Sequence, residues 1–315
     1  MKSFHKSFRT PSFLALAVAA ALAGCAATQD AGHSAMNMVK SATGQAQVVR
    51  QDVAPALYQV AYSPSENVVY AVSAGNPKDP ASGVKSKLFK LDPETLAVKA
   101  EIELPKPGYG LTLDDEAHRL YIVDTRGGTL MVYDTTLGQV TSSVTMPPVL
   151  DAQGKPEKIE YREIVVDKAN NRLYLPAMSY HDSKLQVVNL DTLTVERTIP
   201  GFNFGATGIS MDSGAGKLYV SNLMGQLFVV DIGTLAITDR FEVQGDQLLN
   251  LVVDHDNKRL LAVDQGFDRL DVVRKERGGL NYQTRTQGNQ VLALDPSSGK
   301  VLQNIKVGTQ PVAML

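Results

Sequence analysis

The residues best suited to recognise a ligand lie in one long polar segment, 265–289, toward the carboxyl end of the chain. Its sequence, QGFDRLDVVRKERGGLNYQTRTQGN, interleaves basic and aromatic side chains. Basic groups can pair with phosphates while aromatic rings stack on bases, which is typical of proteins that bind single-stranded nucleic acid. The alternative is a charged, solvent-exposed hairpin extension. The candidate binding residues of this segment are Phe267, Arg269, Arg274, Lys275, Arg277, Tyr282 and Arg285.

Side chains that could support catalysis or hold a metal are scattered along the sequence. His181, beside Asp182, is a single candidate acid or base, and an exposed loop histidine is the simpler interpretation. Asp124 and Asp264 are weak candidates for a cation site, because such residues more often accept hydrogen bonds from backbone groups at turns. The sequence has no glycine-rich phosphate loop, no GxSxG motif and no HExxH motif. It therefore predicts a protein that is not an enzyme and has no resident cofactor.

The only cysteine of the chain, Cys25, lies where a bacterial lipoprotein would carry its lipid. Lys2, Lys6 and Arg9 precede the apolar stretch 12–23, which is too short to span a bilayer, and Leu-Ala-Gly-Cys follows. This arrangement resembles a lipobox, which implies cleavage before Cys25 and attachment of palmitate and other acyl chains there. The alternative is an ordinary signal peptide with an incidental cysteine. We expect residues 1–24 to be a lipoprotein signal peptide and 25–46 to be a lipidated flexible tether.

Composition limits the partners that this chain can take. The 315 residues carry a formal net charge of −2, and 43% of them are hydrophobic. This balance permits a packed core and excludes a generally basic coat protein for nucleic acid. Ala26, rather than an aspartate, after the cysteine favours sorting to the outer membrane, facing the periplasm. The predicted partners are a membrane, through the lipid at Cys25, and either single-stranded nucleic acid or an envelope protein.

An internal repeat from residue 58 onward predicts the elements that position these residues. In five units a polar turn residue precedes an aromatic or apolar anchor by seven positions, and the pairs are 63/70, 114/121, 167/174, 212/219 and 254/261. A third apolar run ending in an acidic turn follows in each unit, for example at Asp92, Asp134 and Asp191. Short strands joined by tight turns, four to a unit, are typical of β-propeller blades.

The motif Lys217-Leu-Tyr-Val-Ser-Asn222 and its repetition resemble the YVTN signature of the YncE-like β-propellers. This resemblance, to a family within the WD40/YVTN-like repeat superfamily, covers 47–315 and implies an all-β propeller of seven four-stranded blades in the periplasm, with single-stranded DNA as one ligand. Only five full units are present, and they span 57–105, 107–147, 161–201, 206–244 and 248–307. Residues 309–315 match only the opening strand of a sixth unit, and 47–53 resemble the strand that closes the last blade of such a ring, a blade that is absent here. We expect a C-terminally incomplete propeller, and the alternative is a natural five-bladed ring.

The repeat also predicts which face carries function. If strands a to d alternate in direction, the loops that enter strand a and leave strand b share one side, where every long loop lies. His118 and His255 fall in the short a–b turns and are expected on the opposite side. Three sets of residues are expected to surround the channel mouth: Tyr58, Tyr109, Arg162, Thr207 and Leu249; Gln59, Gly110, Glu163, Gly208 and Asn250; and Ser73, Asp124, Ala177, Asn222 and Asp264.

Together these patterns predict an envelope-anchored, non-enzymatic binding or scaffold protein that uses its loop-rich face, with Tyr58, Tyr109, Arg162 and Asn222 joining the basic segment. The alternative is a propeller enzyme, lactonase-like or similar to quinoprotein dehydrogenases, with a metal or cofactor at the channel mouth.

Overall fold

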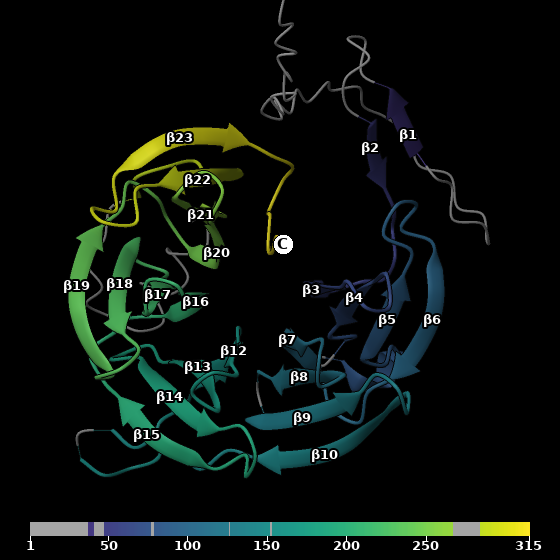
Figure 1. Cartoon of the computed structure of the whole chain (residues 1–315), viewed down its shortest axis with the longest axis horizontal. Helices are drawn as coiled ribbons and strands as arrows, with labels where there is room; N and C mark the ends of the chain where they lie inside the picture. Colours follow the sequence, from purple (N-terminus) through teal and green to yellow (C-terminus); the bar gives the residue numbers. More distant parts are fainter. Residues whose placement is uncertain (1–36, 41–46, 77–78, 126, 152, 267–283) are drawn as a thin grey trace, which may run out of the picture.

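The structure of this chain is a computed structural model, which describes residues 37–40, 47–76, 79–125, 127–151, 153–266 and 284–315. Besides the two-stranded pair β1–β2, the strands form five β-sheets, which Figure 1 shows arranged in a ring about a central axis, with an opening between the first and the last sheet. The one helix in these ranges is a short 3-10 turn, η1 (Pro80–Ser82). None of the described helices is long and apolar enough to cross a membrane. The predicted all-β propeller with five four-stranded blades is confirmed.

Each blade is an antiparallel meander whose strands follow chain order from the channel outwards. The first two blades consist of β3 (Leu57–Ser63), β4 (Val68–Ser73), β5 (Lys87–Leu91) and β6 (Val98–Glu103), then β7 (Gly108–Asp114), β8 (Arg119–Asp124), β9 (Thr129–Asp134) and β10 (Gln139–Thr145). The third consists of β11 (Glu160–Tyr161) and β12 (Val165–Asp167), which share the inner position, with β13 (Arg172–Met178), β14 (Lys184–Asn189) and β15 (Val195–Ile199). The fourth and fifth consist of β16 (Ala206–Asp212), β17 (Lys217–Asn222), β18 (Gln226–Asp231) and β19 (Ala236–Glu242), then β20 (Leu248–Asp254), β21 (Arg259–Asp264), β22 (Gln290–Leu294) and β23 (Val301–Lys306).

The polar residue that recurs seven positions before each anchor caps the turn between the first two strands of its blade. Asp114 Oδ1 accepts a hydrogen bond from the Ala117 amide at 3.1 Å, and Asp167, Asp212, Asp254 and the Ser63 hydroxyl accept the equivalent bond in their own turns. Each turn ends on a residue with positive φ, which in the second blade is His118 at 56°. In each turn the side-chain oxygen accepts a hydrogen bond from a turn amide and so fixes the conformation of the four-residue connection. A connection of fixed length explains why the polar residue always lies seven positions before the anchor.

The outer turns use the same device, with one difference from the sequence prediction. Asp134 Oδ1 accepts bonds from the Thr136 and Leu137 amides, and Asp92, Asp231 and Asp295 act similarly in their blades. In the third blade the residue at this position is Asn189, whose Oδ1 accepts from the amides of Asp191 and Thr192. The expected acidic turn at Asp191 was therefore two residues too late, because an amide oxygen serves as well as a carboxylate here.

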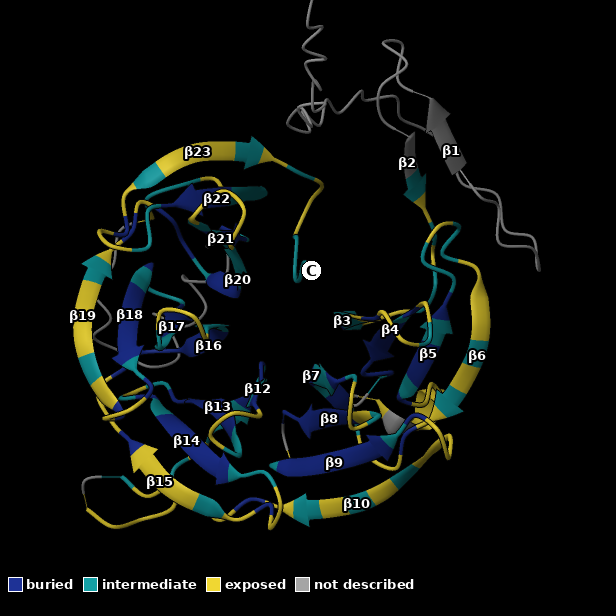
Figure 2. Cartoon of the chain, in the orientation of Figure 1, coloured by how far each residue is buried: buried dark blue, intermediate teal, exposed yellow. Residues whose placement is uncertain are grey.

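The anchors form the contacts between neighbouring blades. Tyr70, Tyr121, Tyr174 and Tyr219 are buried, and each lies in a hydrophobic cluster that joins its blade to the next one. Figure 2 shows this burial most clearly on the middle strands, while the outermost strands β6, β10, β15, β19 and β23 consist mainly of exposed and partly buried residues. The fifth anchor, Leu261, is only partly buried, since no described blade follows its own.

One expectation about the end of the propeller was wrong. Residues 309–315 form no strand; they run irregularly into the interior of the ring, and no described strand pairs with them (Figure 1). At the other end, residues 47–50 form β2 (Gln47–Arg50), which pairs with β1 (Asn37–Lys40). β1 lies within the segment expected to be a flexible tether.

Candidate functional site

The inner strand of each blade is irregular at the same position, near the channel mouth. The register shifts between Leu57 and Gln59, and equivalent shifts skip residues 109–110, 207–208 and 249–250 in the second, fourth and fifth blades. In the third blade the inner strand is interrupted at 162–164, between β11 and β12. Bulges remove residues from the ladder and redirect their side chains, and they are common beside functional sites. The irregular positions coincide with the first two sets of residues expected at the channel mouth.

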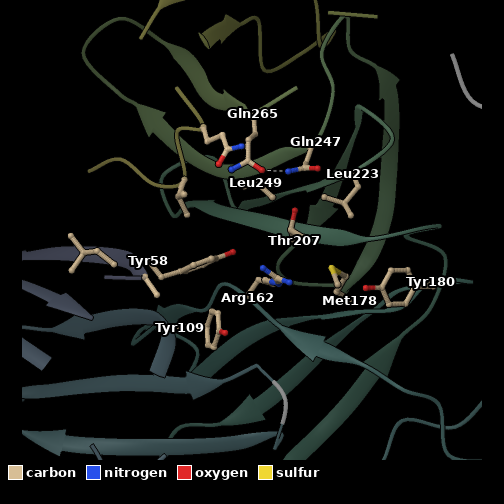
Figure 3. A pocket seen from close by; sticks show the side chains of 14 residues that line it. Tyr58, Tyr109, Arg162, Met178, Tyr180, Thr207, Leu223, Gln247, Leu249 and Gln265 are labelled. Atoms are coloured by element: carbon tan, nitrogen blue, oxygen red, sulfur yellow. Dashed lines mark hydrogen bonds between the residues drawn. The ribbon is translucent and has the colours of Figure 1, made fainter. Parts of the chain in front are cut away.

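A cavity of about 420 Å³ lies at this mouth. Tyr58, Tyr109, Arg162, Thr207 and Leu249 all line it, so the structure brings together one residue from the bulge of every blade (Figure 3). Its remaining walls come from loops of the predicted functional face and from the C-terminal segment, and these residues are Ala56, Leu57, Met178, Tyr180, Leu223, Gln247, Gln265, Gln310 and Val312. Gln247 donates a hydrogen bond to Gln265 across the rim. Among the described residues that line the cavity, Arg162 is the only charged one.

Tyr58, Tyr109 and Arg162 form a compact aromatic and cationic group in this cavity. The two rings meet edge to face, with centroids 5.1 Å apart and an interplanar angle of 66°. The Arg162 guanidinium lies 5.9 Å from both ring centroids, and its NH2 group bonds to a Glu160 carboxylate oxygen at 2.6 Å. Because the Arg162 side chain is 29% exposed, the guanidinium keeps a surface toward the cavity. Such a group can receive an anionic ligand that also carries a flat ring.

A second layer of polar residues lies among the same bulges. Glu163 is 2% exposed, and one of its oxygens, Oε2, accepts hydrogen bonds from Gln59 Nε2 and Asn250 Nδ2, both at 3.2 Å. Asn250 Oδ1 in turn accepts from the Met314 amide at 3.1 Å. Burial raises the pKa of Glu163 well above its usual value, and the bond from Asn250 opposes that rise only in part. The repeat register predicted Glu163 at the channel mouth, but no feature of the sequence indicated that its side chain would be buried.

Glycine allows the inner strands to approach one another at this level. A methyl group on Gly110 would lie 2.6 Å from the Arg162 carbonyl oxygen and 2.9 Å from the Glu163 Cα, so only glycine fits between β7 and this backbone. Gly110 thereby lets β7 pack directly against the backbone that carries Arg162 and Glu163.

The third set of residues expected at the mouth does not line the cavity. Asn222 is fully buried; its Nδ2 donates to the Phe202 carbonyl and to Gln226, and its Oδ1 accepts from the Met224 and Gln226 amides. Asp264 is likewise buried and accepts from Thr286, Gln290 and two backbone amides. Asp124 is 3% exposed. These residues end the second strand of their blades, where they hold the following loops in place.

The predicted basic segment is described only in part. Phe267, Arg269, Arg274, Lys275, Arg277 and Tyr282 lie outside the described residues, as does Cys25. Arg285 is described, and its NH1 group donates to the carbonyl oxygens of Met224 and Val243, both at 2.9 Å, while NH2 pairs with Glu242 at 2.7 Å. The structure thus gives Arg285 a role in joining the loops of the fourth and fifth blades.

The histidines expected in the turns and loops of the blades lie apart from one another in the described ranges. His118 and His255 lie in a–b turns, at the opposite ends of the strands from the b–c loops, as expected. His181 is exposed beside a separate surface cavity, and the Asp182 carboxylate next to it accepts bonds from the Gly201 and Asn203 amides. No group of three or more His, Cys, Asp or Glu residues suited to a metal occurs among the residues that the structure describes.

Comparisons with known proteins agree with this architecture. The "Uncharacterized protein YncE" of Salmonella typhi is 24% identical over 291 residues, which cover 84% of this chain and 80% of that protein. The protein of the same name from Escherichia coli K12 is 25% identical over 241 residues, 74% of this chain and 66% of the relative. No family model matches the chain.

Two solved structures share the fold at low sequence identity. A crystal structure of a nidogen/laminin complex aligns with a TM-score of 0.56 and 15% identity, over 82% of this chain and 84% of that one. A functionally unknown protein from Desulfotomaculum acetoxidans aligns with a TM-score of 0.51 and 12% identity, over 73% and 65%. The blades and the bulge-lined channel mouth therefore define a β-propeller with one loop-rich face. Its repeats and its relatives support, more particularly, a YncE-like propeller.

Proposed function

We propose that this protein is a non-enzymatic binding protein of the bacterial envelope, and that it binds single-stranded nucleic acid at the channel mouth. The observation that carries the proposal is the cavity that Tyr58, Tyr109 and Tyr180 line together with the Arg162 guanidinium, the one charged group among the described lining residues. A cavity of about 420 Å³ has room for a nucleotide, whose base contacts the rings while its phosphate meets Arg162. The amides of Gln247, Gln265 and Gln310 at the rim supply hydrogen bonds to sugar or base edges.

The net charge of the chain favours binding of nucleic acid at a local site rather than over a broad, positively charged surface. Removal of residues 1–24 would leave more acidic than basic side chains, so unspecific attraction to phosphates is weak. Binding should therefore depend on a few side chains at the mouth, and its salt dependence should be shallow.

Replacing Tyr58 by leucine tests this site. We expect the affinity for a labelled 12-nucleotide single-stranded DNA, followed by fluorescence anisotropy, to fall by roughly 5-fold or more, because stacking contributes about 1–3 kcal/mol per base. Tyr62→Leu is the matched control, since Tyr62 lies on the same strand but is 43% exposed and bonds to Asn67 in the a–b turn, away from the cavity. Equal effects of the two variants, or no binding by the unaltered protein, would exclude the mouth as a nucleic-acid site.

We further propose that a lipid on Cys25 anchors the protein to the envelope. The expected result is that the unaltered chain sediments with the membrane fraction of a bacterial host and needs detergent for release. Cys25→Ser should move it to the soluble periplasmic fraction, because several acyl chains contribute about 0.8 kcal/mol per buried CH₂. Membrane association that survives this substitution would argue against the lipid anchor.

A further inference from the structure

Buried polar atoms without a hydrogen-bond partner gather where the inner bulges meet. Seven buried side-chain atoms among the described residues lack a partner, and four of them are Tyr58 Oη, Gln59 Oε1, Arg162 Nε and Glu163 Oε1. Most buried polar groups in proteins are paired, because burying an unpaired one is costly. Four such atoms in two pairs of consecutive residues, on the inner strands of the first and third blades, which the bond from Gln59 to Glu163 joins, indicate a place built to contact something else.

We propose that Glu163 and Gln59 form a binding site for a hard cation in the propeller channel, among the bulges that surround the mouth cavity. Two of the four atoms are the oxygens Glu163 Oε1 and Gln59 Oε1, whereas the Tyr58 hydroxyl lies beside the Arg162 guanidinium and is not counted as a ligand. Carboxylate and amide carbonyl oxygens are donors that Ca²⁺ and similar cations prefer. Nothing in the mouth cavity's proposed contacts to nucleic acid uses these atoms, so the cation site does not depend on the proposed function.

The orientation of Glu163 leaves one of its oxygens available to a cation. The Gln59 and Asn250 amide groups both donate to Oε2, and they thereby hold the carboxyl group in one position. The bond from the Met314 amide to Asn250 Oδ1 fixes the orientation of the Asn250 amide. Oε1 accepts no bond, and Glu163 is 2% and Gln59 8% exposed, so water reaches neither freely.

The charges around Glu163 favour a bound cation as well. A buried carboxylate needs a positive partner or a proton. The guanidinium next in sequence, Arg162, is already paired with Glu160 at 2.6 Å, and none of the described ion pairs involves Glu163. With one carboxylate among mostly neutral donors, the site belongs at the weak end of protein Ca²⁺ affinities, with a Kd of about 10⁻⁴–10⁻³ M.

Calcium titration of the full chain, by isothermal calorimetry in chelator-treated buffer, tests the proposal. We expect the unaltered protein to bind about one Ca²⁺ in the stated range. Glu163→Gln keeps the shape of the side chain but removes its charge, and it should weaken binding by at least about tenfold. Gln59→Leu removes a second oxygen and should weaken binding severalfold, which keeps the proposal testable if the first variant does not fold.

Glu116→Gln is the control, because this carboxylate is 88% exposed in an a–b turn and pairs with Lys168. It should bind Ca²⁺ as the unaltered protein does. The proposal is overturned if the unaltered protein binds no Ca²⁺ at several times the expected Kd, if folded Glu163→Gln or Gln59→Leu retains full affinity, or if Glu116→Gln weakens binding equally.

Discussion

Replacement of Arg162 by methionine is expected to weaken binding of single-stranded DNA by roughly 30-fold or more, the largest effect of any single substitution at the channel mouth. Among the described residues that line the cavity, Arg162 is the only charged one, and its guanidinium lies at an equal distance from the rings of Tyr58 and Tyr109. A phosphate held there makes charge-assisted hydrogen bonds in a site partly shielded from water, where each is stronger than at an open surface. Methionine preserves most of the packing but removes every donor.

The measurement is anisotropy of a labelled oligonucleotide at several salt concentrations. Loss of one phosphate contact should also reduce the slope of log affinity against log salt by about one. Arg240→Met is the matched control, because it removes the same charge from the outer strand β19, where the guanidinium lies 5.7 Å from the Phe228 ring centroid. Removal of Arg162 leaves Glu160 without its partner, so the fold of the variant must be verified by circular dichroism. A folded Arg162→Met protein with unchanged affinity would mean that the ligand does not contact this residue.

The repeat predicted the blades well because it reflects a local rule of turn chemistry. A side-chain oxygen at Ser63, Asp114 and their equivalents must cap a four-residue turn, so the spacing to the buried anchor cannot vary. The rule is chemical rather than tied to one residue type, which explains why Asn189 replaces an aspartate in the third blade. Because this spacing is constant, the sequence alone predicted that Tyr58, Tyr109 and Arg162 lie together.

The depth of each residue in the channel could not be predicted in the same way. Register assigns Tyr58, Gln59 and Ser73 to one end of a blade, but the bulge at Tyr58 decides that its ring faces the cavity while Ser73 is buried. A bulge has no reliable sequence signature, because it depends on the fit of neighbouring strands. The strand expected at 309–315 does not form, for a related reason. A β-strand needs a neighbouring strand to pair with its backbone N–H and C=O groups, and a suitable sequence alone does not supply that neighbour.

A second large effect is expected on stability, from the burial of Glu163. In the absence of divalent cations, Glu163→Gln should become more stable than the unaltered protein as pH rises above about 4.3, the ordinary pKa of glutamate. Burial raises the pKa of Glu163 in the folded state, so the folded protein binds a proton that the unfolded chain has released. Folding stability then falls with increasing pH, by about 1.4 kcal/mol per pH unit, until the folded-state pKa is reached. Glutamine resembles the protonated acid and has no such loss.

Urea unfolding of both proteins between pH 4.5 and pH 8 measures the difference directly. The charged and titratable groups that surround Glu163 are Arg162, which is paired with Glu160, and Tyr58, whose own pKa is raised by burial, so neither changes charge within this range. The stability advantage of Glu163→Gln should therefore grow with pH and shrink again when Ca²⁺ is added to the unaltered protein, since a cation replaces the proton as the partner of the carboxylate. A pH-independent difference would mean that Glu163 has an ordinary pKa in the folded protein, and that the channel keeps its carboxylate solvated.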